Sequence, residues 1–437
     1  MQYIGDLDWH TLRLGAFHVL AHVGERSIDT REALLTRFQN ILFHKIYQDE
    51  PAFEAFRECL DDDAFKKIDR RARGVRPNPA AALMPAESEM PWFFTVELWQ
   101  ADRRFPAPGV GPIAEEHAFR YLDLGKKLGI FTPTNALSER GELLRSFYMA
   151  DHPGAIDWTS PTPNPLLVDT RASQIILLDA LLREDAFLPL MMIEFVNDPD
   201  AGIARAYRRV AGVQQPELLM RAAQRVYDVL GVEPDIHTAL ELKHLRHFID
   251  TIAVKKNHLN QALPRMEFAV DIGLIERAGA GSRGREPVYR PTSVTERFAK
   301  VVAGFRDDPT AAQNALDGSF FGNVAHFYGI AAAPAVGDEE SLYWFCRGYS
   351  LVKRPAGFTP GRSAAFAGAL LALQSGRLVE LSGIFDAVYR SARGPHGPFL
   401  GFSGGSRFDR EFLIRVDDCL ESRLANTFAP PSPVNPQ

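Results

Sequence analysis

Arginine side chains gather around one glycine-rich stretch in the second half of the chain, and their spacing suits contact with phosphate. Arg283 and Arg285 flank Gly284, while Arg277 and Arg290 stand before and after the stretch. Guanidinium groups bind phosphate oxygens through paired hydrogen bonds, and arginines can also enter the minor groove of a duplex. The cluster therefore predicts contact with a nucleic-acid backbone.

A second polar group precedes this stretch, within a segment of helical periodicity. Leu259, Leu263, Met266 and Val270 repeat at helical spacing, so we expect them to face a core. The outward residues would then include amides and cations that can pair with base edges or phosphates. These candidate DNA-binding residues are Lys255, Lys256, Asn257, Asn260, Gln261 and Arg265.

Pro264 interrupts this segment, because a proline inside a helix removes a backbone donor and costs about 3 kcal/mol. Two helix arrangements are compatible with a proline at this position. Either the helix is kinked, or it begins near Pro264 and offers a shorter readable surface.

The order of elements in this region carries a family resemblance. A helix ends near Asp271, a strand follows, the loop 278–287 comes next, and Val288–Arg290 reads as a second strand before another helix. This order resembles the C-terminal half of a winged-helix domain, over residues 240–300. The resemblance implies a recognition helix for the major groove and a hairpin that meets the backbone. Winged helices also serve as dimerisation or protein-docking modules, so an architectural role is the alternative.

An earlier segment looks like a shortened copy of the same pattern. A helix is expected over 114–128, followed by Gly129-Ile130-Phe131 and then Leu137-Ser138-Glu139-Arg140-Gly141. The interval between Phe131 and Leu137 has no room for a wing of normal length. Residues 90–150 are therefore interpreted as a degenerate winged-helix-like region.

Metal-dependent catalysis is the competing interpretation. Asp235 with Glu241 and Lys243 matches the letters of a nuclease signature, in which carboxylates hold Mg²⁺. That site requires neighbouring strands, whereas residues 239–252 read as a helix. Glu241 and His244 have the spacing of a bundle metal site, but one copy of that motif is too few. We therefore assign no catalytic and no metal-binding residue.

Glycine-rich stretches elsewhere lack the features of nucleotide sites. Residues 403–406 and 279–281 are not followed by the Gly-Lys-Ser/Thr of a phosphate cradle, so no cofactor is expected. The C-terminal region alternates basic and aromatic residues, as single-strand binders do. A core of aromatics with arginines at its rim explains the same pattern.

Composition sets the broad class. The chain has 437 residues, 46% of them hydrophobic, which predicts several domains with sizeable cores. No apolar window is long enough to span a membrane, and the N-terminus lacks the charge pattern of a secretory signal. Three separated cysteines support neither disulfides nor a zinc site. We therefore expect a cytoplasmic protein without membrane partners.

Charge is distributed unevenly along the chain. The total is −6, and residues 1–63 hold twelve acids against six bases, so that end would repel a duplex. Residues 243–297 reverse the balance, with ten bases against six acids. We expect the acidic end to meet protein partners and the basic region to meet duplex DNA.

These observations predict a mainly α, multi-domain helical protein with at least one winged-helix module that carries a short β-hairpin wing. Its expected parts are an acidic helical region (1–75), the degenerate region (90–150), a helical domain (166–235), the winged helix (236–306) and a C-terminal helical domain (320–428). Helices are expected over 168–197 with a break or kink at Pro189, and over 201–210, 216–230, 362–374 and 409–424, while 307–319 is expected to be a connector. The predicted function is a non-enzymatic DNA-binding subunit of a larger assembly, such as a regulator, a genome-maintenance complex or an anti-phage defence system. A metal-dependent nuclease subunit and a protein-docking scaffold are the alternatives.

Overall fold

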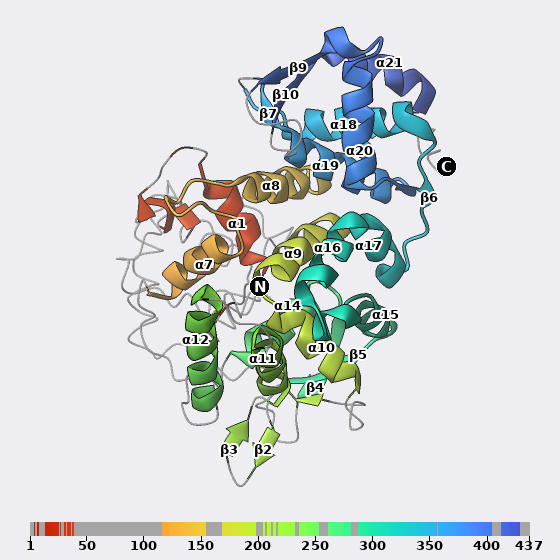
Figure 1. The fold of residues 1–437 in the computed structure, drawn as a ribbon. Coiled ribbons are helices and arrows are strands. Elements are labelled where there is room, and N and C mark those ends of the chain that lie inside the picture. The colour runs from red at the N-terminus through yellow and green to blue at the C-terminus, as the bar shows by residue number, and fades with distance from the viewer. Residues whose placement is uncertain are drawn as a thin grey trace, which may run out of the picture. The chain divides into compact units, whose positions relative to one another are not determined.

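The computed structural model describes residues 4, 7, 14–25, 27, 30–31, 33–35, 37–38, 116–153, 168–197, 204–205, 208–210, 213–215, 217–231, 236–252, 261–280, 287–355, 357–403 and 412–428. The chain divides into two compact units, Met1–Thr310 and Ala311–Gln437. Most described residues lie in helices with a few short strands between them, which confirms the predicted mainly α class (Figure 1).

The first unit is helical, and several of its helices are buried on most sides. Its helices are α1 (Ala16–Val23), α7 (Glu116–Lys127), α8 (Glu139–Asp151), α9 (Arg171–Glu184), α10 (Phe187–Asn197), α11 (Glu217–Leu230), α12 (Ile236–Ile252), α14 (Ala262–Asp271), α15 (Ser293–Val301) and the 3-10 helix η2 (Ala303–Arg306). Along α10, Leu188, Met191, Met192 and Phe195 are all fully buried. A helix that is apolar all round belongs to a core, and α10 packs against α11, α15 and η2.

The expected long helix 168–197 is two helices, and the break lies before Pro189. Helix α9 ends at Glu184 with Asp185 as its C-cap, and α10 starts at Phe187. Pro189 therefore falls in the first turn of α10, where a backbone N–H has no partner within the helix. Proline at this position leaves the helix intact.

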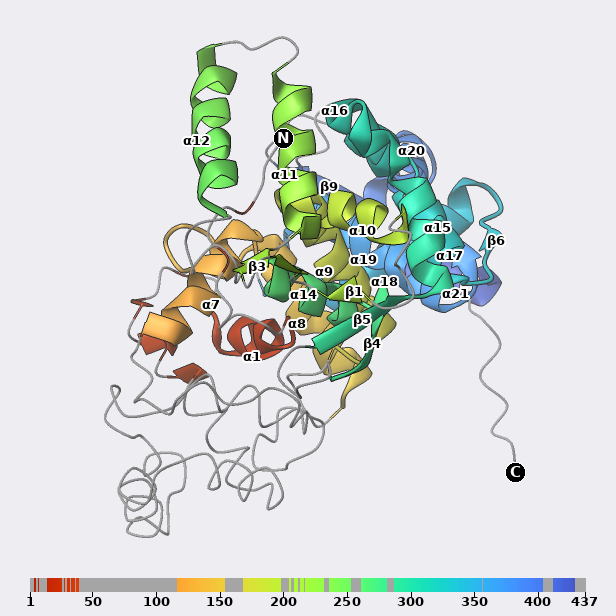
Figure 2. The same ribbon diagram turned by 90° about the horizontal axis from the view of Figure 1, so that it is seen from below.

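Short strands replace the helix expected over 201–210, so that prediction was wrong. The strands of the first unit are β1 (Ala204–Arg205), β2 (Arg208–Val210), β3 (Val213–Gln215), β4 (Ile275–Ala280) and β5 (Pro287–Pro291). One antiparallel sheet has the order β1-β5-β4 (Figure 2), and β2 pairs with β3 (Figure 1). Ala204 pairs with Tyr289, far along the chain, and local periodicity carries no information about such a partner.

The second unit contains a close-packed helix pair and small sheets. Its helices are α17 (Phe320–Tyr328), α18 (Gly337–Val352), α19 (Gly361–Gln374), α20 (Leu381–Ala392), α21 (Asp418–Phe428) and the 3-10 helix η3 (Gly397–Phe399), and its strands are β6 (Ala333–Pro334), β7 (Thr359–Pro360), β8 (Arg377–Leu378), β9 (Leu400–Ser403) and β10 (Leu413–Val416). Helices α18 and α19 cross where Gly348 and Gly368 meet. A Cβ on Gly348 would lie 2.2 Å from the Ala364 carbonyl oxygen, so only glycine allows this backbone contact.

Two further expectations need correction, and two are confirmed. The segment 307–319, expected to be a connector, contains helix α16 (Pro309–Gly318). The helix expected over 409–424 begins only at Asp418, because residues 413–416 form β10 between β7 and β9. The helices expected over 216–230 and 362–374 are present as α11 and α19.

Candidate nucleic-acid interface

The β4–β5 hairpin places several of the predicted residues. Ile275 pairs with Pro291 and Glu276 with Arg290, and the register shifts between Arg277 and Gly279. Such a bulge increases the local twist of a hairpin. The connection that carries Arg283 and Arg285 lies outside the described residues.

Of the arginines on this hairpin, Arg290 is the one whose side chain is described. It is exposed, and its Nη2 donates to Glu276 Oε2 at 2.9 Å across the two strands. An exposed ion pair of this kind is worth about 0–1 kcal/mol, so Arg290 can exchange this partner for a phosphate at small cost. Arg277 lies in β4, and its side chain is not described.

Helix α14 precedes the hairpin and settles the question that Pro264 raised. The helix begins at Ala262, so Pro264 lies in its first turn and breaks no helical hydrogen bond. It ends in a left-handed residue, Gly273, with φ of 72°. Gly273 N donates to Val270 O at 2.9 Å and Leu274 N to Ala269 O at 2.8 Å, which closes the last turn and directs the chain into β4.

Arg265 does not face outward, so its predicted position on the exposed side of the helix was wrong. Its side chain and that of Asp185 are both 0% exposed. Arg265 Nε donates to Asp185 Oδ2 at 2.7 Å, and Nη2 donates to Oδ1 at 3.0 Å. Nη2 also donates to the Ile4 carbonyl, and Nη1 donates to the Gln261 carbonyl at 3.1 Å. Every guanidinium nitrogen is therefore used inside the protein.

The opposite end of α14 is enclosed as well. Leu14 N donates to Asp271 Oδ2 at 2.8 Å, and Gln174 Nε2 donates to the Asp271 carbonyl at 3.4 Å. Glu267, in the middle of the helix, is fully buried and accepts a hydrogen bond from the Tyr289 hydroxyl of β5. The helix is thus held from several sides within the first unit.

Gln261, at the start of α14, is also buried, with only 3% of its surface exposed. The predicted outward position of this amide was therefore wrong too. The remaining candidates on this flank, Lys255, Lys256, Asn257 and Asn260, lie outside the described residues. Among the candidates whose side chains are described, Arg290 alone is accessible.

Helix α12 carries the residues of the competing nuclease interpretation. Glu241, Lys243, His244 and His247 are exposed along this helix, which lies beside α11 in both ribbon views (Figures 1 and 2). Asp235 lies outside the described residues. Within the described part of the chain, no three histidine, cysteine or acidic side chains are grouped so as to hold a metal ion.

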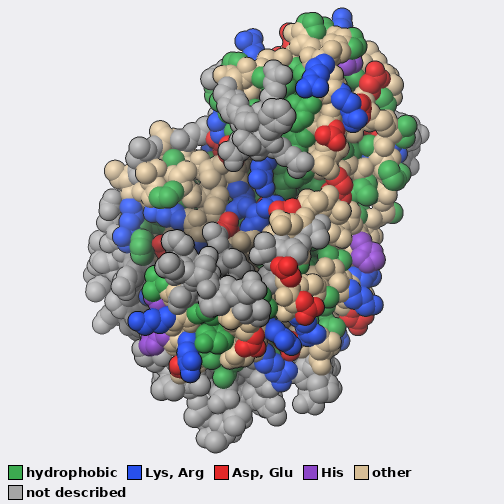
Figure 3. All heavy atoms as spheres, viewed as in Figure 1, with side chains coloured by type: hydrophobic (Ala, Val, Ile, Leu, Met, Phe, Trp, Pro, Cys, Tyr) green, Lys and Arg blue, Asp and Glu red, His purple; other side chains and the backbone are tan. Residues whose placement is uncertain are grey.

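The aromatic residues of helix α18 lie in the core of the second unit. Tyr343, Phe345 and Tyr349 are at most 1% exposed. Nearby cations are engaged at the surface, with Lys353 Nζ 2.8 Å from Asp418 Oδ1 and Arg390 Nε 2.7 Å from Asp338 Oδ2. Basic and acidic side chains are interspersed on the visible face of this unit (Figure 3). The pattern that suggested single-strand binding thus has a structural explanation.

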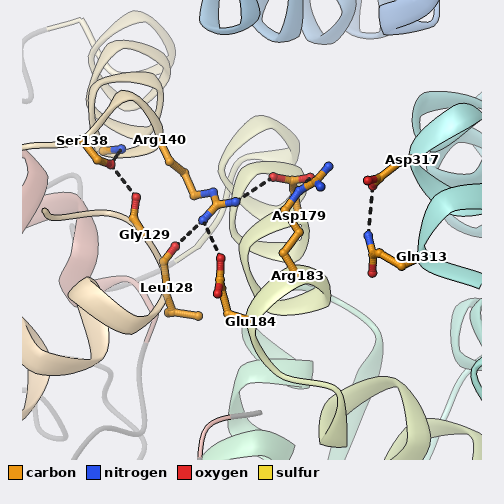
Figure 4. Close-up of polar contacts among 10 residues, drawn as sticks. Leu128, Gly129, Ser138, Arg140, Asp179, Arg183, Glu184, Gln313 and Asp317 are labelled. Carbon is orange, nitrogen blue, oxygen red and sulfur yellow. Dashed lines mark hydrogen bonds and ion pairs between the residues drawn. The ribbon is translucent and has the colours of Figure 1, made fainter. Parts of the chain in front are cut away.

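A polar network around Arg140 was not foreseen from the sequence (Figure 4). Arg140, in the first turn of α8, donates to the Leu128 carbonyl and lies 3.3 Å from Asp179 Oδ2. Arg183 Nε donates to Asp179 Oδ1 at 2.9 Å. Burial raises the pKa of the Glu184 carboxyl, and the neighbouring Arg140 and Arg183 partly offset that rise. These contacts link the end of α7 to α8 and α9, so we interpret the network as one that stabilises the packing of the three helices.

Comparison with known proteins finds no family model, curated protein or solved structure that this chain matches. In the part of the chain with described positions, no helix is both long and apolar enough to cross a bilayer.

Proposed function

We propose that this chain binds duplex DNA without catalysing a reaction on it, and that the hairpin β4–β5 makes the contact. The hairpin belongs, in this proposal, to a winged-helix module of residues 236–306. The observation that supports it is the antiparallel pairing of β4 with β5, with α14 directly before the hairpin and α15 directly after it. Winged helices present a basic hairpin in this sequence of elements.

The burial of α14 determines which kind of contact is proposed. Because Arg265 and Gln261 are enclosed, they cannot read base edges in the major groove. A contact through the arginine-bearing connection of the hairpin would be mainly with phosphates, which fix position and affinity but carry little sequence information. The proposal is therefore DNA binding with weak base discrimination, and it requires no cofactor.

The same proposal includes the cellular setting. The chain would act in the cytoplasm as a subunit of a larger assembly, in which the acidic N-terminal region meets protein partners and the hairpin meets DNA. A regulator, a genome-maintenance complex and an anti-phage defence system all suit this arrangement. Charge asymmetry supports it, since an acidic end repels a duplex and a basic segment attracts one.

Salt dependence of binding tests the proposal. Anisotropy of a labelled duplex is measured over a range of salt with the full chain and with an Arg283→Ala/Arg285→Ala variant. Each lost phosphate contact lowers the slope of log K against log salt by about one unit, so the variant should lose about two. An Arg362→Ala/Arg393→Ala variant removes the same charge from exposed sites of the second unit and should keep the wild-type slope. Equal slopes in the wild type and the hairpin variant would contradict the proposal.

One observation favours a second candidate, a scaffold that uses the module to dock protein. Both ends of α14 are fastened inside the first unit, at Arg265 and at Asp271, as an architectural helix would be. A pull-down from the host with and without nuclease treatment separates the two functions. Partners that survive nuclease treatment, together with duplex affinity that does not fall as salt rises, would support the scaffold and contradict DNA binding.

A further inference from the structure

The α7–α8 segment has the same local construction as the α14–α15 segment. Helix α7 ends at a left-handed glycine, Gly129 with φ of 65°, as α14 ends at Gly273 with φ of 72°. Gly129 N donates to Lys126 O at 3.0 Å and Ile130 N to Gly125 O at 2.7 Å. These two bonds have the same spacing as those that close α14.

The residues after each glycine also correspond. Phe131 forms an antiparallel bridge with Leu137, and Ile275 pairs with Pro291 at the same distance from its glycine. The residue after each pair caps the next helix. Ser138 Oγ accepts from Gly141 N at 3.1 Å, and Thr292 Oγ1 accepts from Thr295 N at 3.3 Å. The hairpin between them is reduced to residues 132–136 in the first segment and spans 276–290 in the second.

A backbone neighbour beside the second arm adds to the correspondence. Leu137 N donates to Glu25 O at 2.6 Å, so a residue that follows α1 lies beside the second arm of the short hairpin. In the later segment, β1 follows α10 and lies beside the second arm, β5. The order of the three backbone segments is therefore the same in both, although their hairpins differ in length.

We infer that the first unit contains two copies of one module and that α7, the counterpart of α14, offers a second contact for the DNA backbone. The polar side of α7 is accessible where that of α14 is not. Lys127 and Asp123 have side chains 32% and 43% exposed, joined at 3.1 Å, and Arg120 and Lys126 are partly exposed. At the place that Asp123 occupies in α7, α14 has Glu267, which is fully buried.

Charge decides the kind of ligand. The described side chains of α7 include three cations, Arg120, Lys126 and Lys127, against one acid, Asp123. Lys126 and Lys127 lie in the last turn of α7, where cations interact favourably with the helix C-terminus. In the inferred contact, Lys127 would exchange its partly exposed pair with Asp123 for a phosphate. The inference rests on the proposed DNA-binding function, and it adds a contact distant in sequence from Arg283 and Arg285.

The test compares matched charge removals in the full chain. Lys126→Gln/Lys127→Gln is measured beside Arg283→Ala/Arg285→Ala and the Arg362→Ala/Arg393→Ala control, with the same labelled duplex and salt series. The α7 variant should lower the salt slope by about two units and weaken binding at low salt, with an unchanged urea midpoint.

The possible outcomes separate the two claims. If the hairpin variant loses slope while the α7 variant binds like the wild type, the α7 contact is wrong and the proposed function stands. If the wild type does not bind duplex at all, both are wrong. If the α7 variant loses binding only together with its urea midpoint, the lysines are structural and the contact is again wrong.

Discussion

Replacing Arg265 by methionine tests the burial of the helix that the sequence assigned to DNA. The substitution keeps most of the side-chain volume and removes the donors at 2.7 and 3.0 Å from the Asp185 carboxylate. That carboxylate would keep Ile4 N, at 3.4 Å, as a weak partner in a site with 0% exposure. The Ile4 carbonyl would also lose the donor that Arg265 supplies.

The magnitude follows from the burial of both charges. Removing one partner of a buried ion pair costs about 3–5 kcal/mol, because the other charge is left uncompensated. An Arg265→Met/Asp185→Leu double variant removes both charges, and such replacements are often near neutral. The unpaired Ile4 carbonyl remains, at a cost of about 1–3 kcal/mol. The double variant should therefore be more stable than Arg265→Met by about 2 kcal/mol or more.

Urea unfolding followed by hydrogen exchange measures the stability difference between the two variants. Peptides from α9 and α14 report on the unfolding of the first unit alone. Arg265→Met should shift their midpoint strongly, and the double variant should recover part of the shift. A loss below about 1 kcal/mol for Arg265→Met is the value of an exposed pair. That result would refute the burial of Arg265 and would make it an accessible candidate for DNA binding again.

Two predictions concern the second unit. A Cβ at Gly368 would lie 2.4 Å from the Trp344 carbonyl oxygen, so Gly368→Ala should lower the unfolding free energy by about 3 kcal/mol. A Cβ at Gly383 would have nothing within 4 Å, so the matched Gly383→Ala should raise the unfolding free energy by up to about 1 kcal/mol. Urea unfolding measures both variants. Equal changes in unfolding free energy for the two variants would disprove the close crossing of α18 and α19. The hydrogen bond from Arg377 holds the pKa of Glu340 below its ordinary 4.5. Its stabilisation is therefore complete above pH 4.5 and is lost as pH falls through the lower folded-state pKa. Acid titration of stability should be shallower for Glu340→Gln, and an unchanged titration would argue against the pairing.

The sequence was sufficient for the helical class and for several elements. Apolar spacing predicted α11 and α19, and the Gly273 turn followed by two short strands was readable from residue types. These features depend on neighbours within one or two turns of the chain. Local patterns therefore indicated them without knowledge of the tertiary fold.

The sequence failed where a distant partner decides the environment. Arg265 lies outside the apolar stripe of its helix, which predicted an outward position. Asp185 and Ile4 nevertheless enclose it, and neither is near it in sequence. The strand β1 likewise exists because residues around Tyr289 pair with it. A polar residue on a predicted helix is thus a poor guide to a binding surface until the packing around that helix is known.

Hydrogen exchange of the full chain with and without duplex DNA is the measurement closest to the central claim, that the hairpin and not α14 meets DNA. Peptides that span residues 277–291 should become protected when duplex is added, and α14 peptides should exchange as they do without it. Protection confined to α14, or no protection in the hairpin at saturating duplex, would contradict the account.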